Sequence, residues 1–219
     1  MITNDKHTIG ILMQGGIWEW TVDIVQEYKN NFPNAEIVIS TWNDEKTEDI
    51  PCEIIKTQSP SETSHNPHIN HQIVGTQIGL QKMKSSIIMK CRTDQFIHNR
   101  NIFKLFLEPP CTKNKIMVSR PQMGVYNKCD YFVNDFVQIA HKEVLSEYWN
   151  SMPLYDGSYS VAAEIYLTRN YIQNIKKDEG SWPTLMEKYF CIKDEYLDWK
   201  KESAKEMKFE EFSKYYRKK

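Results

Sequence analysis

The segment IIMKCRTDQF, residues 87–96, carries the side chains best suited to chemistry. Its apolar start, Ile87 to Met89, is typical of a buried strand that turns polar at its carboxyl end. Alternate side chains of a strand point to the same side, so we expect Lys90, Arg92 and Asp94 to lie together. The two cations suit phosphate, Arg92 in a bidentate manner, and the carboxylate could hold Mn²⁺ or Mg²⁺ against a diphosphate. The alternative is an internal Arg92–Asp94 ion pair that orients the loop.

Two further strands end in residues that can approach a nucleotide. The apolar run from Ile9 to Met13 stops at a glycine pair, which lets a base or phosphate come close to the backbone. The alternative for the glycine pair is an ordinary strand-to-helix turn. The run from Glu36 to Thr41 is the second such strand. The candidate contacts at these two ends are Gln14, Gly15, Gly16, Thr41 and Trp42. No GxGxxG or GxxxxGK[ST] motif occurs, so a Rossmann dinucleotide site and a P-loop have no support.

Amide side chains lie at the start of a predicted helix. Apolar residues from Ile69 to Met83 recur at helical spacing, so the helix should begin near residue 69. Asn70 and Gln72 then lie in the first turn, where their amides and the helix N-terminus could face a nucleotide. The alternative for Asn70 is a helix N-cap.

Two carboxylates in the second half are candidates for acid/base catalysis. Glu164, in VAAEIYL, lies beside an apolar stripe, so it needs either a partner, such as Arg169, or a role. Asp135, in YFVND, should enter the site from a later strand. An inverting transferase needs a carboxylate that deprotonates the acceptor hydroxyl, whereas a retaining one does not.

Strand-like and helix-like segments alternate up to about residue 119. Further strands are expected at 115–119 and 131–139, with a helix through Trp149. After Asp156 only helices are expected, at 161–175, at 182–190 and from Leu197 to the end. This pattern predicts an α/β fold with a mostly parallel sheet, helices on both faces and a helical C-terminal part. Ligands of such sheets bind at the carboxyl ends of the strands, where most of the candidate residues lie.

The composition is that of a globular protein that does not bind nucleic acid by bulk charge. The chain has 219 residues, 40% hydrophobic and 26% charged, and a formal net charge of −1. Its five cysteines form no CxxC pair, which favours reduced thiols over a disulfide framework. The N-terminus lacks a signal-peptide pattern and no segment approaches the length of a membrane span, so we expect a cytoplasmic protein.

Six short stretches, taken in order, resemble the WavE family of lipopolysaccharide-synthesis glycosyltransferases. They are MQGGI, FPNAEIVISTW, NHQIVGTQIGL, IIMKCRTD, VSRP and, more weakly, AAEIYL. The resemblance runs from about Gln14 to about Leu167, and the final fifty or so residues match nothing. It implies a GT-A-like fold, in which an α/β domain binds a nucleotide-sugar and the second half builds the acceptor site.

The resemblance also assigns roles to individual residues. Arg92-Thr93-Asp94 stands where GT-A enzymes keep an Asp-x-Asp motif, with the first acid replaced by Arg92. His71 stands where many members have an arginine, and Trp42 is expected to line the base pocket. In this interpretation Glu164 and Asp135 are the acceptor-side acid/base candidates, and Asp94 is the metal ligand.

The resulting prediction is a single glycosyltransferase domain, residues 1–219. It transfers a sugar, expected to be a hexosyl group, from a nucleoside diphosphate to a glycan or lipid-linked glycan. The predicted process is bacterial lipopolysaccharide or capsule synthesis. Residues 1–119 would bind the donor, and residues 120–219 would form the acceptor side. The basic, aromatic C-terminal segment could contact the inner membrane peripherally, although packing on its own domain is favoured. The alternative function is a catalytically inactive, GT-A-like module that binds a glycan or a partner.

Overall fold

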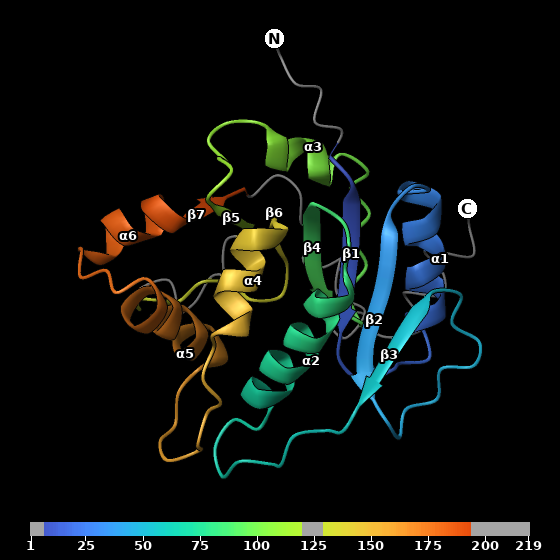
Figure 1. Cartoon of the computed structure of the whole chain (residues 1–219), viewed down its shortest axis with the longest axis horizontal. Helices are drawn as coiled ribbons and strands as arrows, with labels where there is room; N and C mark the ends of the chain where they lie inside the picture. Colours follow the sequence, from blue (N-terminus) through green and yellow to red (C-terminus); the bar gives the residue numbers. More distant parts are fainter. Residues whose placement is uncertain (1–6, 120–128, 194–219) are drawn as a thin grey trace.

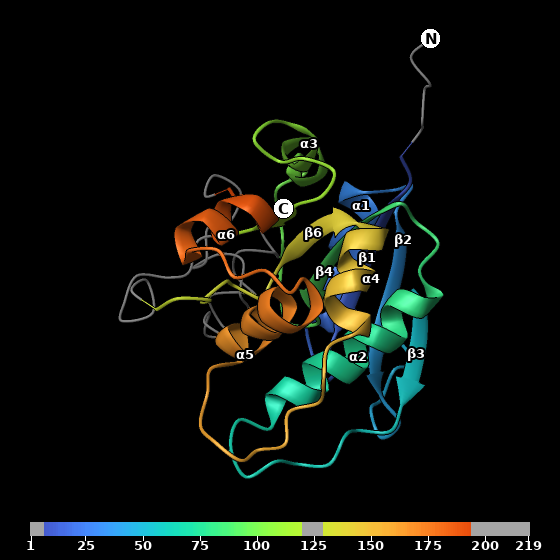
Figure 2. The same cartoon turned by 60° about the vertical axis from the view of Figure 1, so that its left-hand side comes forward.

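The computed structural model describes residues 7–119 and 129–193, which form a seven-stranded mixed sheet with helices on both faces (Figure 1; Figure 2). The elements are β1 (Ile9–Gln14), α1 (Thr21–Asn31), β2 (Glu36–Trp42), β3 (Glu53–Thr57), α2 (His68–Lys82), β4 (Ile87–Arg92), α3 (Ile102–Leu107), β5 (Ile116–Val118), β6 (Gln138–His141), α4 (Lys142–Asn150), α5 (Ala163–Arg169), the π-helical η2 (Asn170–Ile175), α6 (Trp182–Tyr189) and β7 (Phe190–Ile192).

The strand order in the sheet is β3-β2-β1-β4-β6-β5-β7. The first four strands along the chain, β1 to β4, pair in parallel, whereas β6 runs antiparallel to both β4 and β5. This arrangement confirms the predicted α/β class with a mostly parallel sheet. It also brings the carboxyl ends of β1, β2 and β4 to one edge, where a ligand can reach all three.

Period-two alternation divides the core into two clusters, one on each face of the sheet. On one face, Ile11 and Met13 of β1 pack with residues of α1 and α3. On the other face, Leu12 packs with residues of α2, α4, α5 and α6. The second face of the sheet therefore carries α2, α4, α5 and α6.

Helix α2 lies close to the sheet because it carries glycine where it crosses β1. A Cβ at Gly79 would come within 2.3 Å of the Leu12 Cδ1 atom, so only hydrogen fits there. This close approach holds the first turn of α2 over the carboxyl ends of β1 and β4.

Three predictions about secondary structure need correction or restriction. The chain after Asp156 is not purely helical, since Phe190–Ile192 forms β7 beside β5. Three residues that directly follow a helix give no strand periodicity of their own, which is why the sequence pattern missed them. The strand expected over 131–139 begins only at Gln138. The helix expected from Leu197 onward lies outside the described residues.

The prediction of reduced cysteines was wrong for one pair. Cys111, before β5, and Cys191, in β7, form a disulfide with a Cα–Cα distance of 5.4 Å. They are 80 residues apart in the sequence and meet only because β7 adds to the sheet next to β5, which cysteine spacing cannot show. Among the described residues, no helix is long and apolar enough to cross a membrane.

Candidate functional site

Two cavities lie along the carboxyl edge of the sheet. The smaller cavity, of about 250 Å³, is lined by Gln14, Gly15, Gly16, Trp18, Trp42, His68, His71, Gln72, Arg92, Thr93 and Asp94. The larger cavity, of about 820 Å³, is lined by Asn66, Gln72, Cys129, Phe132, Asp135, Phe136 and the run from Tyr159 to Ile165, together with Arg169. Gln72 lines both cavities, so the two adjoin at the first turn of α2.

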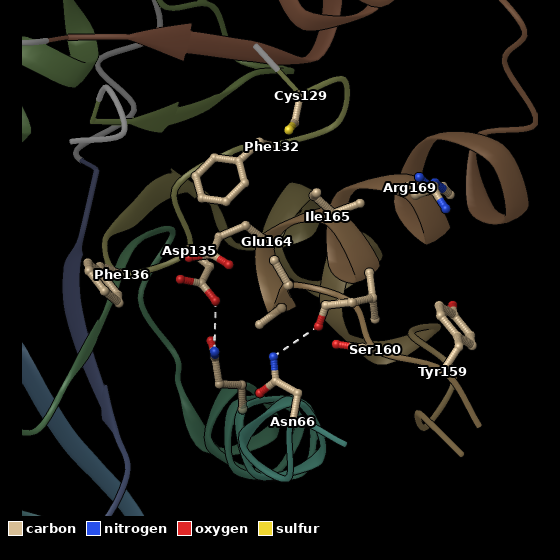
Figure 3. A pocket seen from close by; sticks show the side chains of 14 residues that line it. Asn66, Cys129, Phe132, Asp135, Phe136, Tyr159, Ser160, Glu164, Ile165 and Arg169 are labelled. Atoms are coloured by element: carbon tan, nitrogen blue, oxygen red, sulfur yellow. Dashed lines mark hydrogen bonds between the residues drawn. The ribbon is translucent and has the colours of Figure 1, made fainter. Parts of the chain in front are cut away.

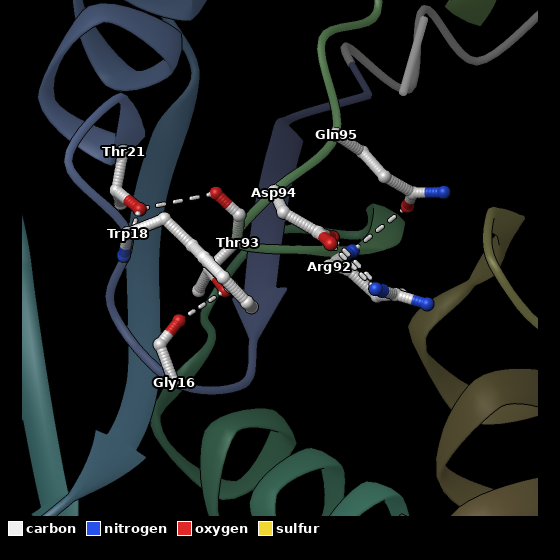
Figure 4. Close-up of polar contacts among 7 residues, drawn as sticks. All are labelled: Gly16, Trp18, Thr21, Arg92, Thr93, Asp94 and Gln95. Atoms are coloured by element: carbon white, nitrogen blue, oxygen red, sulfur yellow. Dashed lines mark hydrogen bonds and ion pairs between the residues drawn. The ribbon is translucent and has the colours of Figure 1, made fainter. Parts of the chain in front are cut away.

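The wall of the smaller cavity is formed by the loops that follow β1 and β4. Gly15 has a φ of 135°, a conformation that favours glycine, and its N–H donates to the Ser40 carbonyl at 3.2 Å. Thr93 joins the two loops, because its hydroxyl donates to the Gly16 carbonyl at 2.5 Å (Figure 4). Its N–H also donates to the Gln14 carbonyl, at 3.3 Å. The strand ends predicted to approach a nucleotide are thus held against each other.

Arg92 and Asp94 form the bidentate ion pair that was the alternative to a metal site (Figure 4). The guanidinium donates from Nε to Oδ1 at 2.8 Å and from Nη2 to Oδ2 at 2.5 Å. The Asp94 side chain is only 1% exposed, whereas the Arg92 side chain is 27% exposed. Arg92 also lies over the ring of Phe136, with its Cζ 5.0 Å from the ring centroid.

The described residues do not fit a divalent metal at this place. Mn²⁺ and Mg²⁺ need several oxygen ligands, and both Asp94 oxygens already accept hydrogen bonds from Arg92. Within 7–119 and 129–193, no group of three His, Cys, Asp or Glu side chains could hold a metal ion. A metal ion bound to Asp94 would therefore find no such group of ligands in this part of the chain.

Aromatic rings form the outer part of the smaller cavity. Trp42 packs against the His71 imidazole edge to face, with centroids 5.0 Å apart. His71 is fixed by two contacts, Nδ1 to the Pro67 carbonyl at 2.9 Å and Nε2 to the Ser59 hydroxyl at 2.8 Å. Trp18 is 41% exposed at the rim and stacks on Trp20 at 5.5 Å. Trp18 was not predicted, although the pair of tryptophans in WEW, one residue after the glycines, was a usable signal.

Three residues predicted to contact the nucleotide do not line either cavity. Thr41 is fully buried and faces the α1 side with Ile39, because alternation puts it opposite Trp42. Lys90 is also fully buried, between the sheet and α4, with its Nζ 4.9 Å from the Trp149 ring centroid.

Asn70, the third of these residues, has a structural role within α2. The helix begins at His68, so Asn70 is not its N-cap. Its amide donates to the Tyr155 carbonyl at 2.9 Å and accepts from the Tyr155 N–H at 2.8 Å. These two hydrogen bonds hold the loop that leads to the larger cavity.

Both predicted acid/base carboxylates, Glu164 and Asp135, face the larger cavity (Figure 3). Asp135 lies on the approach to β6 and is 2% exposed. Its Oδ2 accepts from the Gln72 amide at 2.7 Å, while its Oδ1 has no hydrogen-bond partner among the described residues. Asp135 lines the larger cavity, and its Oδ1 is a buried hydrogen-bond acceptor that no described residue satisfies.

Glu164 opens helix α5, close enough to Asp135 for their charges to interact. Burial raises the pKa of the Glu164 carboxyl to about 7, and the negative charge of Asp135 adds to this effect. Arg169, the partner considered for Glu164, instead lies over the Tyr131 ring at 5.6 Å. Glu164 therefore titrates near neutrality, where a general acid or base is most useful.

Lys90 is the cation beneath these carboxylates. Its ammonium donates to the Asp135 carbonyl oxygen at 2.8 Å and to Gln72 Oε1 at 3.3 Å. Burial lowers the pKa of Lys90 to about 8, although the charge of Asp135 opposes the shift. Lys90, Gln72 and Asp135 thus form one buried polar network between the two cavities.

The seven-stranded sheet in the order 3-2-1-4-6-5-7, with its cavities at the carboxyl edge, has the fold of GT-A glycosyltransferases. The structure of Mycobacterium tuberculosis glucosyl-3-phosphoglycerate synthase with Mn²⁺, UDP and glucosyl-3-phosphoglycerate is similar, with TM-score 0.52 and 9% identity, covering 85% of this chain and 69% of that chain. S. aureus TarS is similar with TM-score 0.54 and 8% identity, covering 86% of this chain and 35% of that one.

The model of the family described as WavE lipopolysaccharide synthesis matches residues 9–203. The chain belongs to this family, which confirms the resemblance inferred from the six sequence stretches. Comparison with curated proteins finds no match.

Proposed function

We propose that this chain is a glycosyltransferase that moves a hexosyl group from a nucleoside diphosphate to a glycan acceptor in lipopolysaccharide or capsule synthesis. The observation that carries the proposal is the junction of the two cavities at Gln72. A transferase must hold its two substrates in adjoining spaces, with the reacting atoms at the junction. The family and the GT-A fold are in accord with this activity.

The smaller cavity has the features of a donor site. A backbone turn at Gly15 and Gly16 admits phosphate closely, Arg92 supplies a cation, and the rings of Trp18 and Trp42 offer faces or edges to a base. The larger cavity suits the acceptor, since Asp135 and Glu164 can bind and deprotonate a sugar hydroxyl. This assignment keeps the expected division between a donor part, 1–119, and an acceptor part, 120–219.

Replacing Trp18 by alanine should weaken nucleotide binding by ~5–100-fold, because base stacking on an aromatic ring contributes about 1–3 kcal/mol. Trp18 is largely at the rim, so the fold should tolerate the change. The measurement is the thermal shift of both proteins over a concentration series of UDP-, GDP-, CDP- and dTDP-sugars, since ligand bound to the folded state raises the melting temperature.

Leu107→Ala is the matched control, because Leu107 is 53% exposed on α3 and lines neither cavity. It should respond to nucleotides as the unmodified chain does. A chain that responds to no nucleotide-sugar would defeat the transferase proposal and favour the inactive glycan- or partner-binding module. Release of nucleoside diphosphate on adding an acceptor glycan separates transfer from binding alone.

A cytoplasmic protein with peripheral contact at the inner membrane completes the proposal. The contact would come from residues 197–219, which mix aromatic and basic side chains. Packing of this segment on its own domain, the favoured arrangement, predicts that the intact chain and a chain ending at residue 196 pellet equally with vesicles that contain anionic lipid, whereas membrane contact predicts that the shorter chain pellets less. Equal pelleting of the two would remove the membrane contact from the proposal.

A further inference from the structure

We infer that Arg92 binds the donor diphosphate directly and that this chain needs no divalent metal for that contact. The inference rests on the proposed function, since it concerns the donor cavity. It differs from the arrangement in the similar M. tuberculosis enzyme, whose complex contains Mn²⁺ and UDP.

The carboxylate that would hold a metal already accepts a hydrogen bond at each of its oxygens. Both Asp94 oxygens accept from Arg92, at 2.8 and 2.5 Å, in a side chain that is 1% exposed. A metal ion at Asp94 would either have to displace a bidentate guanidinium, or bind the remaining lone pairs of a carboxylate that is 1% exposed, beside the positive charge of Arg92. Such charge-assisted pairs are among the stronger hydrogen bonds in proteins, so displacement is unfavourable.

The guanidinium that holds Asp94 retains capacity for a second anion. A guanidinium carries five N–H donors, and Asp94 accepts from two nitrogens, Nε and Nη2. Three N–H groups remain, and within the described parts of the chain they donate to no other residue. Asp94 thereby fixes the plane of the guanidinium, and Arg92 itself lines the smaller cavity.

The position of Arg92 matches where the leaving diphosphate must be. Arg92 lines the smaller cavity, and its guanidinium lies 5.0 Å over the ring of Phe136, which lines the larger cavity. A diphosphate that leaves from the donor sugar develops negative charge at this boundary. A fixed cation there can neutralise that charge without reorganisation, which is the contribution a metal ion makes in other sites.

The test is a calorimetric titration of UDP, GDP, CDP and dTDP into the intact chain, once with Mn²⁺ and once with EDTA, together with Mn²⁺ binding followed by electron paramagnetic resonance. For the unmodified chain we expect the affinity of the best nucleotide to change by less than ~2-fold between the two conditions. We also expect no Mn²⁺ bound in stoichiometric amount without nucleotide.

Arg92→Asp should create a metal site where none existed, since it places two carboxylates two residues apart as in Asp-x-Asp. Its affinity for nucleotide in EDTA should fall ~10–100-fold, because charge-assisted hydrogen bonds are lost. Mn²⁺ should restore part of this loss, with one ion bound per chain. Arg92→Gln should lose the same amount of nucleotide affinity in EDTA, and Mn²⁺ should not restore it. This variant replaces Arg92→Asp in the test if Arg92→Asp does not fold. Arg100→Asp is the matched control, an exposed arginine that donates to Asn31 and should leave nucleotide binding unchanged.

Nucleotide binding that disappears in EDTA in the unmodified chain would overturn the inference and leave the transferase proposal standing. Full affinity of Arg92→Gln in EDTA would overturn the inference in the same way. Absence of any nucleotide binding under both conditions would overturn the proposed function itself, so the two failures are distinct.

Discussion

Glu164→Gln should lower turnover at pH 8 by ~10²–10⁴-fold, the usual contribution of a general base to the rate. The affinity for the donor should stay unchanged. We expect this loss because of the position of the Glu164 carboxylate and because of its raised pKa. Glu164 lines the larger cavity close to Asp135, and burial with the charge of Asp135 raises its pKa to about 7. Glutamine keeps the size and removes the proton acceptor. Sugar transfer is measured at saturating donor, and donor binding is measured separately by calorimetry.

The pH profile should identify Glu164 as the group that must lose its proton. Activity of the unmodified chain should rise with pH through about 7 and level off above it, because the base works only when ionised. The residual activity of Glu164→Gln should lack this rise. Glu143→Gln, an exposed acid in the first turn of α4, is the matched control and should keep both rate and profile.

Asp135→Asn distinguishes the two carboxylates. Asp135 lines the larger cavity and has one carboxylate oxygen without a hydrogen-bond partner among the described residues, so we expect it to orient an acceptor hydroxyl for Glu164. We expect its variant to lose turnover mainly through weaker acceptor binding. If both variants retain near-normal turnover, neither carboxylate is the base, and a retaining mechanism, which needs no such base, accounts for the site.

The same raised pKa has a consequence for stability. The folded chain holds the Glu164 proton up to about pH 7, whereas the unfolded chain loses it near the ordinary value of 4.5. Between these values the folded state binds more protons, so this group makes the free energy of unfolding fall as pH rises. In Glu164→Gln, the free energy of unfolding measured by chemical denaturation should lack this fall between pH 4.5 and 7. The same dependence on pH in both proteins would show that the Glu164 carboxyl is solvated and has its ordinary pKa.

Local sequence patterns marked the strands of the first half of the fold but missed helix α3. Apolar runs ending at polar or glycine residues marked β1, β2 and β4, and the parallel order of such strands brings their carboxyl ends together. Seven of the predicted contacts consequently line the smaller cavity: Gln14, Gly15, Gly16, Trp42, Gln72, Arg92 and Asp94.

The errors share a physical cause, which is that sequence spacing does not show what lies above a strand. Thr41 and Trp42 are neighbours in the chain, yet alternation allows only one of them to face the cavity. Lys90 has the same parity as Arg92, but α4 and its Trp149 cover it completely. The Cys111–Cys191 disulfide depended on a strand too short to give a pattern. Each of these facts needs tertiary packing.

Lys90→Met tests the contribution of Lys90 to the free energy of unfolding and its contribution to turnover as two separate measurements. The ammonium of Lys90 is fully buried, and its pKa falls from the ordinary lysine value of 10.5 to about 8. The shift corresponds to about 3 kcal/mol by which the surroundings of Lys90 as a whole disfavour its charged form. We therefore expect this cation to act outside the packing of the core, through its contacts with Gln72 and the Asp135 carbonyl between the two cavities.

The stability difference between the two proteins should change with pH in a defined direction. From about pH 8 to 10.5 the folded state has lost the Lys90 proton while the unfolded state keeps it. The unfolded state then binds more protons, so the unmodified chain gains up to about 3 kcal/mol relative to Lys90→Met as pH rises across this window. Comparing the two proteins by denaturant unfolding cancels the titration of the tyrosines and thiols that both contain. A constant difference would mean that water reaches Lys90.

Activity should change in a way that loss of packing alone does not produce. The charge of Lys90 lowers the pKa of Glu164, so removing it should move the activity rise to a pH above 7. Turnover at pH 7 should fall by ~10–100-fold, because less of the base is ionised and because Gln72 and Asp135 lose the donor that positions them. Lys90→Arg, which keeps a positive charge, should restore the pH profile in part. A variant with reduced turnover but an unshifted profile would reduce Lys90 to a packing residue and remove it from the acid/base network.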